Sequence, residues 1–95
     1  MLKITTDNEN PEFFTVNLCG RFTAEYVPEV EKALSAPAAK PKKLALDLAE
    51  VTLVDRAAIS FLCAARSRNI AIHNAPLYVR LWMEQEGCKG PLHLD

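Results

Sequence analysis

Few side chains in this 95-residue sequence have the types and spacing that catalysis or metal binding requires. Asp47 and Asp55 could form a carboxylate pair for acid–base chemistry. However, Asp47 lies within an apolar strand pattern and Asp55 directly precedes an apolar helix pattern, so structural roles suffice for both. His73 and His93 have no Cys, Asp or Glu at metal-ligand spacing, and Cys63 has no obvious base beside it. The sequence therefore predicts no enzyme, no cofactor and no metal site.

Length and composition predict one small domain over residues 1–95, in which residues 88–95 form either a short edge strand or a frayed end. Hydrophobic residues make up 49% of the chain, enough for a single core. The formal net charge is −1 and the Lys and Arg residues are scattered, which argues against a nucleic-acid partner. The short basic run at residues 40–43 is interpreted as a solvated loop.

The three cysteines, Cys19, Cys63 and Cys88, are odd in number and match no disulfide framework or metal motif. Such cysteines are typical of a reducing compartment, so we expect a cytoplasmic protein. The N-terminus has no apolar run of the length that a signal peptide or a transmembrane helix needs. Direct insertion into a membrane is therefore not expected.

Alternation of apolar and polar residues predicts the strands. They are expected at residues 2–5, 14–19, 44–49 and 70–73. Gly20 is expected to end the second strand, and residues 50–54 are expected to form a turn after the third. The last three of these strands each have one apolar side and one side that carries a polar residue, namely Asn17, Asp47 or His73.

Apolar residues at intervals of three and four predict three helices, one over residues 25–35, one after Asp55 and one after residues 74–76. Prolines fall in the first turn of the first and third helices, where they are tolerated. Asp55 is a good N-cap, since its carboxylate can accept from the backbone N–H of Ala57 or Ala58. Asn69 is expected to end the second helix in a left-handed conformation.

The resulting order is strand, strand, helix, strand, helix, strand, helix. Strands that are separated by helices pair in parallel through right-handed crossovers. A sheet covered on both faces would show nearly continuous apolar strands, which these are not. The sequence thus predicts an α/β fold, a small mixed β-sheet of about four strands with the helices packed mainly on one face.

The order and spacing of several motifs resemble the STAS domain, the module of bacterial anti-sigma-factor antagonists. The resemblance covers roughly residues 14–86, and its fold, a small mixed sheet with helices on one face, agrees with the fold predicted from periodicity. The matching motifs are Gly20, Leu46-Asp47-Leu48, Val51-Thr52-Leu53-Val54-Asp55, the apolar helix from Ala58, and the passage from His73 to Leu81.

The resemblance implies that the start of the second helix docks on a kinase-like anti-sigma factor. In that family the partner phosphorylates a Ser within an Asp-Ser-Ser-Gly-Leu-like motif. The matching residues are Asp55, Arg56, Ala57, Ala58 and Ile59. Ala57 stands at the position of the phosphorylated Ser and has no hydroxyl, so a phosphate switch cannot operate there. Thr52 and Ser60 are alternative acceptors without an activating partner in the sequence.

By the same resemblance, the partner is bound around residues 52–60. The implied partner-binding residues are Thr23, Thr52, Asp55, Arg56, Ala57 and Ser60. Thr23 replaces the acidic residue that often follows the second strand of the family, and Ser60 is expected to face other packing. Arg56 has two interpretations: it pairs with Asp55 or Glu50 on the surface, or it meets an acidic partner.

The leading hypothesis is therefore a non-catalytic, bacterial protein-interaction module in signal transduction and regulation of transcription. Its partner would be an anti-sigma factor. One alternative is a STAS accessory subunit of a lipid-type ABC transporter, which would bind a transporter subunit. Another is a small-ligand or nucleotide-binding module that uses the strand ends and helix N-termini as an anion site. Formation of a homodimer stays open.

Overall fold

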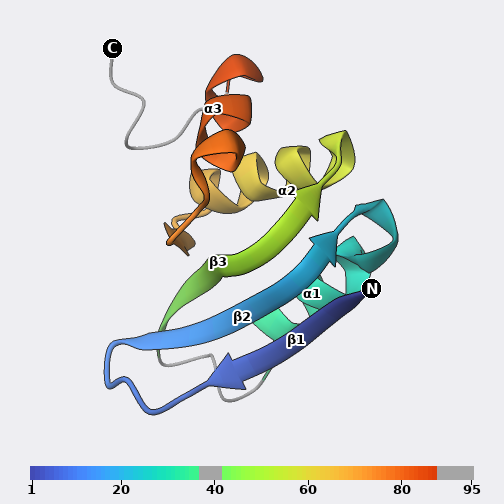
Figure 1. Ribbon diagram of the computed structural model, residues 1–95. Helices are drawn as coiled ribbons and strands as arrows, with labels where there is room; N and C mark the ends of the chain where they lie inside the picture. Colours follow the sequence, from blue (N-terminus) through green and yellow to red (C-terminus); the bar gives the residue numbers. More distant parts are fainter. Residues whose placement is uncertain (37–41, 88–95) are drawn as a thin grey trace.

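The computed structural model describes residues 1–36 and 42–87, which form a four-stranded sheet and three α-helices (Figure 1). In chain order the elements are β1 (Leu2–Asp7), β2 (Phe13–Phe22), the 3-10 helix η1 (Ala24–Tyr26), α1 (Val27–Leu34), β3 (Lys43–Val54), α2 (Arg56–Ser67), β4 (Ala71–His73) and α3 (Leu77–Gln85). The loop expected at residues 36–41 falls largely outside the described residues, and the tail at 88–95, with Cys88 and His93, lies wholly outside them.

The sheet is mixed and its strand order is β1-β2-β3-β4. β1 and β2 pair antiparallel, whereas the pairs β2–β3 and β3–β4 are parallel, as expected for strands that are joined through helices. The sheet and the three helices confirm the predicted α/β fold class.

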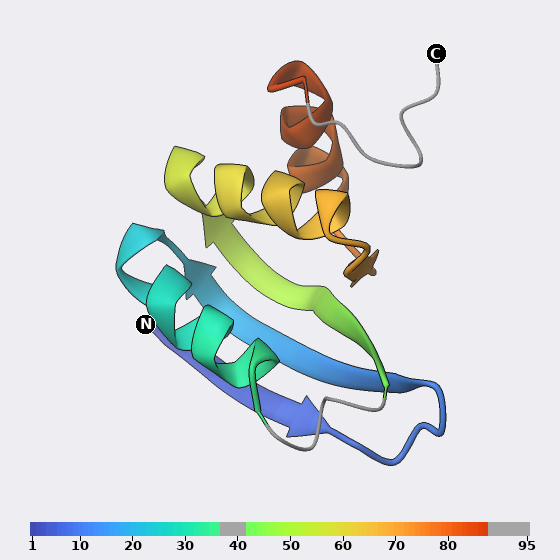
Figure 2. The same ribbon diagram turned by 180° about the vertical axis from the view of Figure 1, so that it is seen from behind.

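The helices cover one face of the sheet. α1 and α2 lie side by side on that face, and α3 packs against α2 (Figure 2). Phe14, Val16 and Leu18 of β2 point toward these helices and are buried, whereas Asn17 and Asp47 point to the opposite face and stay partly exposed. No helix among the described residues covers that opposite face, which we call the open face. The one-sided arrangement predicted from the alternation is confirmed.

The expected turn at residues 50–54 is wrong, because β3 continues to Val54. Its register against β2 shifts twice, and each shift adds one residue to β3. Such bulges let a strand keep its pairing while its side-chain alternation changes. Here they place Leu48, Val51 and Val54, three residues apart, in the core. β2 likewise runs on to Phe22 rather than ending at Gly20.

Gly20 adopts a φ of +108° opposite the start of β1. A Cβ atom there would lie 2.5 Å from the Met1 carbonyl oxygen, which accepts a hydrogen bond from Arg21 N at 3.1 Å. We therefore expect Gly20→Ala to lower the free energy of unfolding by about 2 kcal/mol or more, measured by urea denaturation. Gly87→Ala is the matched control, because its φ is +70° but no atom lies within 4 Å of the added Cβ. Equal losses in the two variants would show that the start of β1 simply moves away.

The helix ends agree with the sequence in most places. Pro28 lies in the first turn of α1 and Asn69 has a φ of +67° after α2, as predicted. α1 begins at Val27 rather than Glu25, because the preceding turn is a 3-10 helix. Pro76 is the N-cap of α3 rather than part of its first turn.

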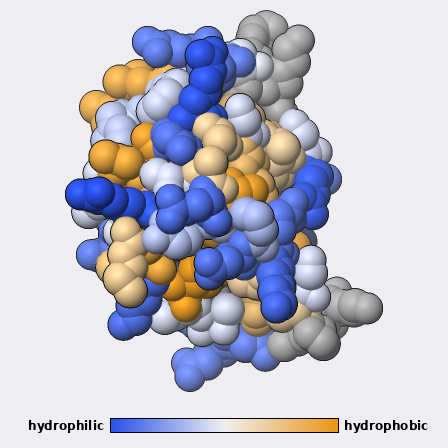
Figure 3. Space-filling model, turned by 90° about the vertical axis from the view of Figure 1, so that its right-hand side faces the viewer, coloured by the Kyte–Doolittle hydropathy of each residue, from blue (hydrophilic) through white to orange (hydrophobic). Residues whose placement is uncertain are grey.

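α3 does not separate apolar and polar residues cleanly between its two sides. Val79 and Met83 are buried against the rest of the core. On its other side, Leu77, Tyr78 and Leu81 are 60%, 44% and 49% exposed. On the side of the molecule shown in Figure 3, hydrophobic residues are exposed in small patches between hydrophilic ones. Exposed apolar side chains in this number are ordinary for a small domain and do not by themselves mark a site.

Candidate functional site

Asp55 joins two parts of the chain that are far apart in sequence. Its Oδ1 accepts a hydrogen bond from Ala58 N at 2.9 Å, which caps the start of α2. Its Oδ2 accepts from Ala24 N at 3.0 Å, which holds the connection between β2 and α1. The predicted N-cap is confirmed, with Ala58 as the donor. The second bond was missed, because nothing in the sequence near Asp55 points to a donor 31 residues away.

The same hydrogen bonds set the protonation of Asp55. The backbone N–H groups of Ala24 and Ala58 donate to the carboxylate and hold the pKa of Asp55 below its ordinary value. In the unfolded chain the pKa of an Asp is about 3.9. Because the folded value is lower, Asp55 stabilises the fold fully above the unfolded pKa, and this contribution is lost as the pH falls through the folded pKa.

We therefore expect the stability difference between the wild type and Asp55→Asn to be constant near neutral pH and to shrink below about pH 4. An amide does not titrate in this range, so the free energy of unfolding of the variant should fall less steeply as the pH decreases. Urea denaturation of both proteins at a series of pH values measures the difference. A difference that stays unchanged down to the acid transition would contradict the assigned role of the carboxylate.

Four of the predicted partner-binding residues are exposed near the start of α2: Thr52, Arg56, Ala57 and Ser60. We call these four residues the helix-start surface. The expectation that Ser60 faces other packing is wrong, since its side chain is on the outer side of α2 together with Ala57. Thr52 lies on β3 rather than in a turn, as the extra residue at the second register shift.

Thr23 takes a different position from the other predicted residues. Phe22 pairs with Val54, so Thr23 and Asp55 follow side by side at the ends of two adjacent parallel strands. Both are partly buried, and the Asp55 carboxylate binds the residue after Thr23. The structure thus brings Thr23 and Asp55 together as the support of the helix-start surface rather than as its most exposed part.

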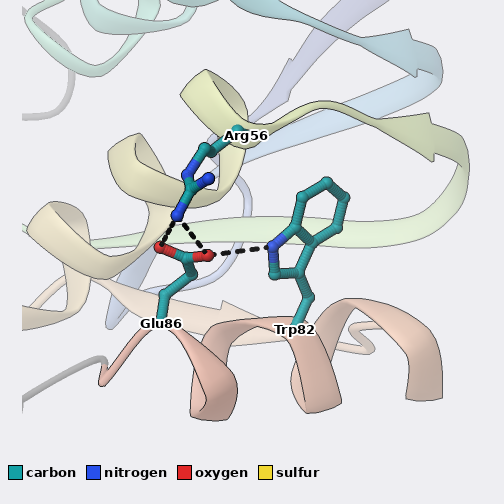
Figure 4. A network of polar contacts seen from close by, with 3 residues as sticks. All are labelled: Arg56, Trp82 and Glu86. Carbon is teal, nitrogen blue, oxygen red and sulfur yellow. Dashed lines mark hydrogen bonds and ion pairs between the residues drawn. The ribbon is translucent and has the colours of Figure 1, made fainter.

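Arg56 pairs with Glu86 at the end of α3, and not with Asp55 or Glu50 as the first of its two interpretations had it. Its Nη2 lies 3.2 Å from Glu86 Oε2 and donates to Oε1 at 3.3 Å. Trp82 Nε1, on α3, donates to the same carboxylate at 3.3 Å (Figure 4). The Glu86 carboxylate is thus held within α3 by Trp82 and links α3 to α2 through Arg56. The Arg56 side chain is still 76% exposed, and pairs of this kind stabilise a fold only weakly. The pair therefore orients Arg56 more than it stabilises the domain.

The residues that could have carried other chemistry have structural partners. Asp47 Oδ1 accepts from Ala49 N at 2.9 Å, and its Oδ2 accepts from the Asn74 side chain at 3.1 Å. The ring of His73 packs edge-on against Phe13, with centroids 5.4 Å apart. Within residues 1–36 and 42–87 no three His, Cys, Asp or Glu side chains are grouped as metal ligands. In the same ranges, none of the helices has the length and hydropathy that crossing a membrane would require.

Comparison with known proteins identifies the family of this chain. The family model described as Mlab, STAS domain matches residues 5–92, so the chain belongs to this family of STAS domains. A solved structure of an uncharacterized protein from Shewanella loihica PV-4, of the DUF3478 family and with a SpoIIAA-like fold, is similar at 16% identity. That match covers 94% of this chain and 81% of the other, with a TM-score of 0.47. No protein among those with curated descriptions matches the sequence.

Proposed function

We propose that this STAS domain is a non-catalytic interaction module that binds a protein partner through the helix-start surface. The observation that carries the proposal is the pair of hydrogen bonds that the Asp55 carboxylate accepts from Ala24 N and Ala58 N. Together they fix the start of α2 against the end of β2. Binding loses less conformational entropy when the contact residues are already held in place. Ala57 and Ser60 are held in this way and exposed.

The partner classes implied by the family differ in how they would use position 57. A kinase-type anti-sigma factor releases its antagonist by phosphorylating a hydroxyl, which Ala57 lacks. A transporter subunit needs no such switch. Ala57 therefore favours constitutive docking, either on a transporter subunit or on an anti-sigma factor that does not phosphorylate this position.

The alternative of a nucleotide or small-ligand site receives less support. An anion at the start of α2 would compete with the Asp55 carboxylate for Ala58 N. The negative charge of that carboxylate would also repel the anion. The open face has a cavity of about 350 Å³, lined by Lys3 together with Asp47 and Glu50 among others, so it offers no single sign of charge to a ligand. Isothermal calorimetry with nucleotides and acyl lipids tests this alternative, and we expect flat titrations.

Affinity capture from extracts of the source organism tests the docking proposal. The wild type and Arg56→Glu serve as baits, and the double variant Arg56→Glu with Glu86→Arg serves as the control. The double variant restores an ion pair between α2 and α3 but keeps the reversed charge at position 56. We expect a protein that the wild type retains and both variants lose, because charge reversal in a docking surface disfavours the complex.

The identity of the captured protein then separates an anti-sigma factor from a transporter subunit. A partner that all three baits retain equally would count against docking through Arg56. A partner that only the single variant loses would show that the ion pair with Glu86, rather than the charge presented to the partner, is what matters.

A further inference from the structure

β1 forms one edge of the sheet and pairs with β2 alone. Arg21 N donates to Met1 O, so Met1 and Arg21 form a hydrogen-bonded pair of the antiparallel ladder. Such pairs recur at every second residue, so the next residues of β1 that bond to β2 are Lys3, Thr5 and Asp7. The backbone N–H and C=O groups of the residues between them point away from the sheet. These residues are Leu2, Ile4 and Thr6.

The two sides of β1 have different surroundings. Leu2 and Ile4 are partly buried against the core on the helix side. Lys3 and Thr5 line the cavity on the open face. A strand added along this edge would continue both faces, with its own apolar residues toward the helices and its polar residues on the open face.

We propose that a second copy of this chain pairs antiparallel with β1, centred on Thr5. In this register Thr5 faces Thr5 of the second copy, and Lys3 faces Asp7 of the second copy on the same side of the sheet. Both Lys3–Asp7 pairs form at once because the arrangement is two-fold symmetric. The Asp7 Oδ1 accepts from Glu9 N at 2.9 Å, which uses one carboxylate oxygen, so the other can accept from the lysine.

The neighbouring registers are less favourable. The outward-pointing backbone groups belong to every second residue of β1. Shifting one strand by a single residue would place them opposite groups that are already bonded to β2, so such registers are excluded. Among the remaining ones, pairing centred on Lys3 places lysine against lysine, and pairing centred on Asp7 places aspartate against aspartate. Centres at Ile4 or Thr6 leave Lys3 and Asp7 without opposite charges. In-register parallel pairing would also put like charges side by side, which is destabilising.

Such a dimer would join two four-stranded sheets into one continuous sheet. It buries little apolar surface, so we expect weak association that depends on protein concentration. The edge does not include the helix-start surface, so the dimer would present two copies of it and could bind a symmetric partner with increased avidity. The dimer itself does not depend on the proposed function.

Sedimentation equilibrium over a range of concentrations tests the proposal, with circular dichroism to check folding. Thr6→Pro removes an outward N–H from the exposed side of β1 without removing a bond to β2. We expect it to weaken self-association about tenfold or more. Lys3→Glu gives an acidic edge and Asp7→Lys a basic one, so each variant alone should be monomeric. An equimolar mixture of the two should form a heterodimer, because both pairs then join an acidic and a basic residue. One pair has its signs exchanged, and the other keeps the wild-type Lys3 and Asp7.

A wild type that stays monomeric at millimolar concentration would overturn the proposal. A dimer that persists unchanged in Thr6→Pro would place self-association on another surface, which would also overturn it. If the Asp7→Lys protein fails to fold because its turn to Glu9 is lost, Thr6→Pro decides the question alone. Partner capture by Thr6→Pro should be retained, so failure of the dimer and failure of the docking surface are distinguishable.

Discussion

Replacing Asp55 by alanine is expected to lower the free energy of unfolding by about 2 to 3 kcal/mol, through loss of an N-cap and of a second charge-assisted hydrogen bond. The first bond caps α2 at Ala58 N, and the second holds Ala24 N at the end of β2. For a domain of this size the melting temperature should fall by about 10 °C or more. Thermal and urea denaturation measure both quantities.

Asp55→Asn separates the two bonds. Its side-chain oxygen can still accept from Ala58 N, since Asn is also a good N-cap, but its amide nitrogen cannot accept from Ala24 N. We therefore expect a loss of about half that of Asp55→Ala. If the Asn and Ala variants lose the same amount, the cap contributes nothing, and if Asn behaves like the wild type, the bond to Ala24 does not stabilise the fold.

The sequence predicted the parts of the fold that depend on neighbouring residues. Phe14, Val16 and Leu18 alternate strictly, so their strand and its buried side could be read directly. The end of β3 could not, because its two extra residues change the spacing of buried residues from two to three. Leu48, Val51 and Val54 therefore look like no regular strand until the pairing with β2 is known.

The same distinction applies to the site. The cap of α2 was predictable because donor and acceptor are three residues apart in the chain. The bond from Ala24 to Asp55 and the pair between Arg56 and Glu86 were not, since they span 31 and 30 residues. The resemblance to the STAS family named Thr23 and Asp55 in one partner-binding set without stating their proximity, which the adjacent ends of β2 and β3 show. It also named Ser60, whose exposure follows from the side of α2 that the core leaves free.

Replacing Ala57 by glutamate is expected to weaken binding of the captured partner by about tenfold to a hundredfold, because it places a fixed negative charge in the docking surface. The fold should stay intact, since Ala57 is exposed in the first turn of α2, where a carboxylate interacts favourably with the helix dipole. Biolayer interferometry gives the affinity, and a melt that differs little from that of the wild type excludes unfolding as the cause.

The control at the same position, Ala57→Ser, also distinguishes a partner with kinase activity toward this position from one without it. It restores the hydroxyl with almost no change in shape, so binding should stay within about threefold of the wild type. If the partner is a kinase-type anti-sigma factor, incubation with the partner and ATP should add one phosphate to this variant and none to the wild type, followed by release, and intact-mass spectrometry detects the addition. If the partner is a transporter subunit or an anti-sigma factor that does not phosphorylate this position, neither protein should gain phosphate, and the identity of the captured protein separates these two. Should Ala57→Glu bind as tightly as the wild type, position 57 lies outside the contact, and docking through the start of α2 is wrong whichever partner is captured.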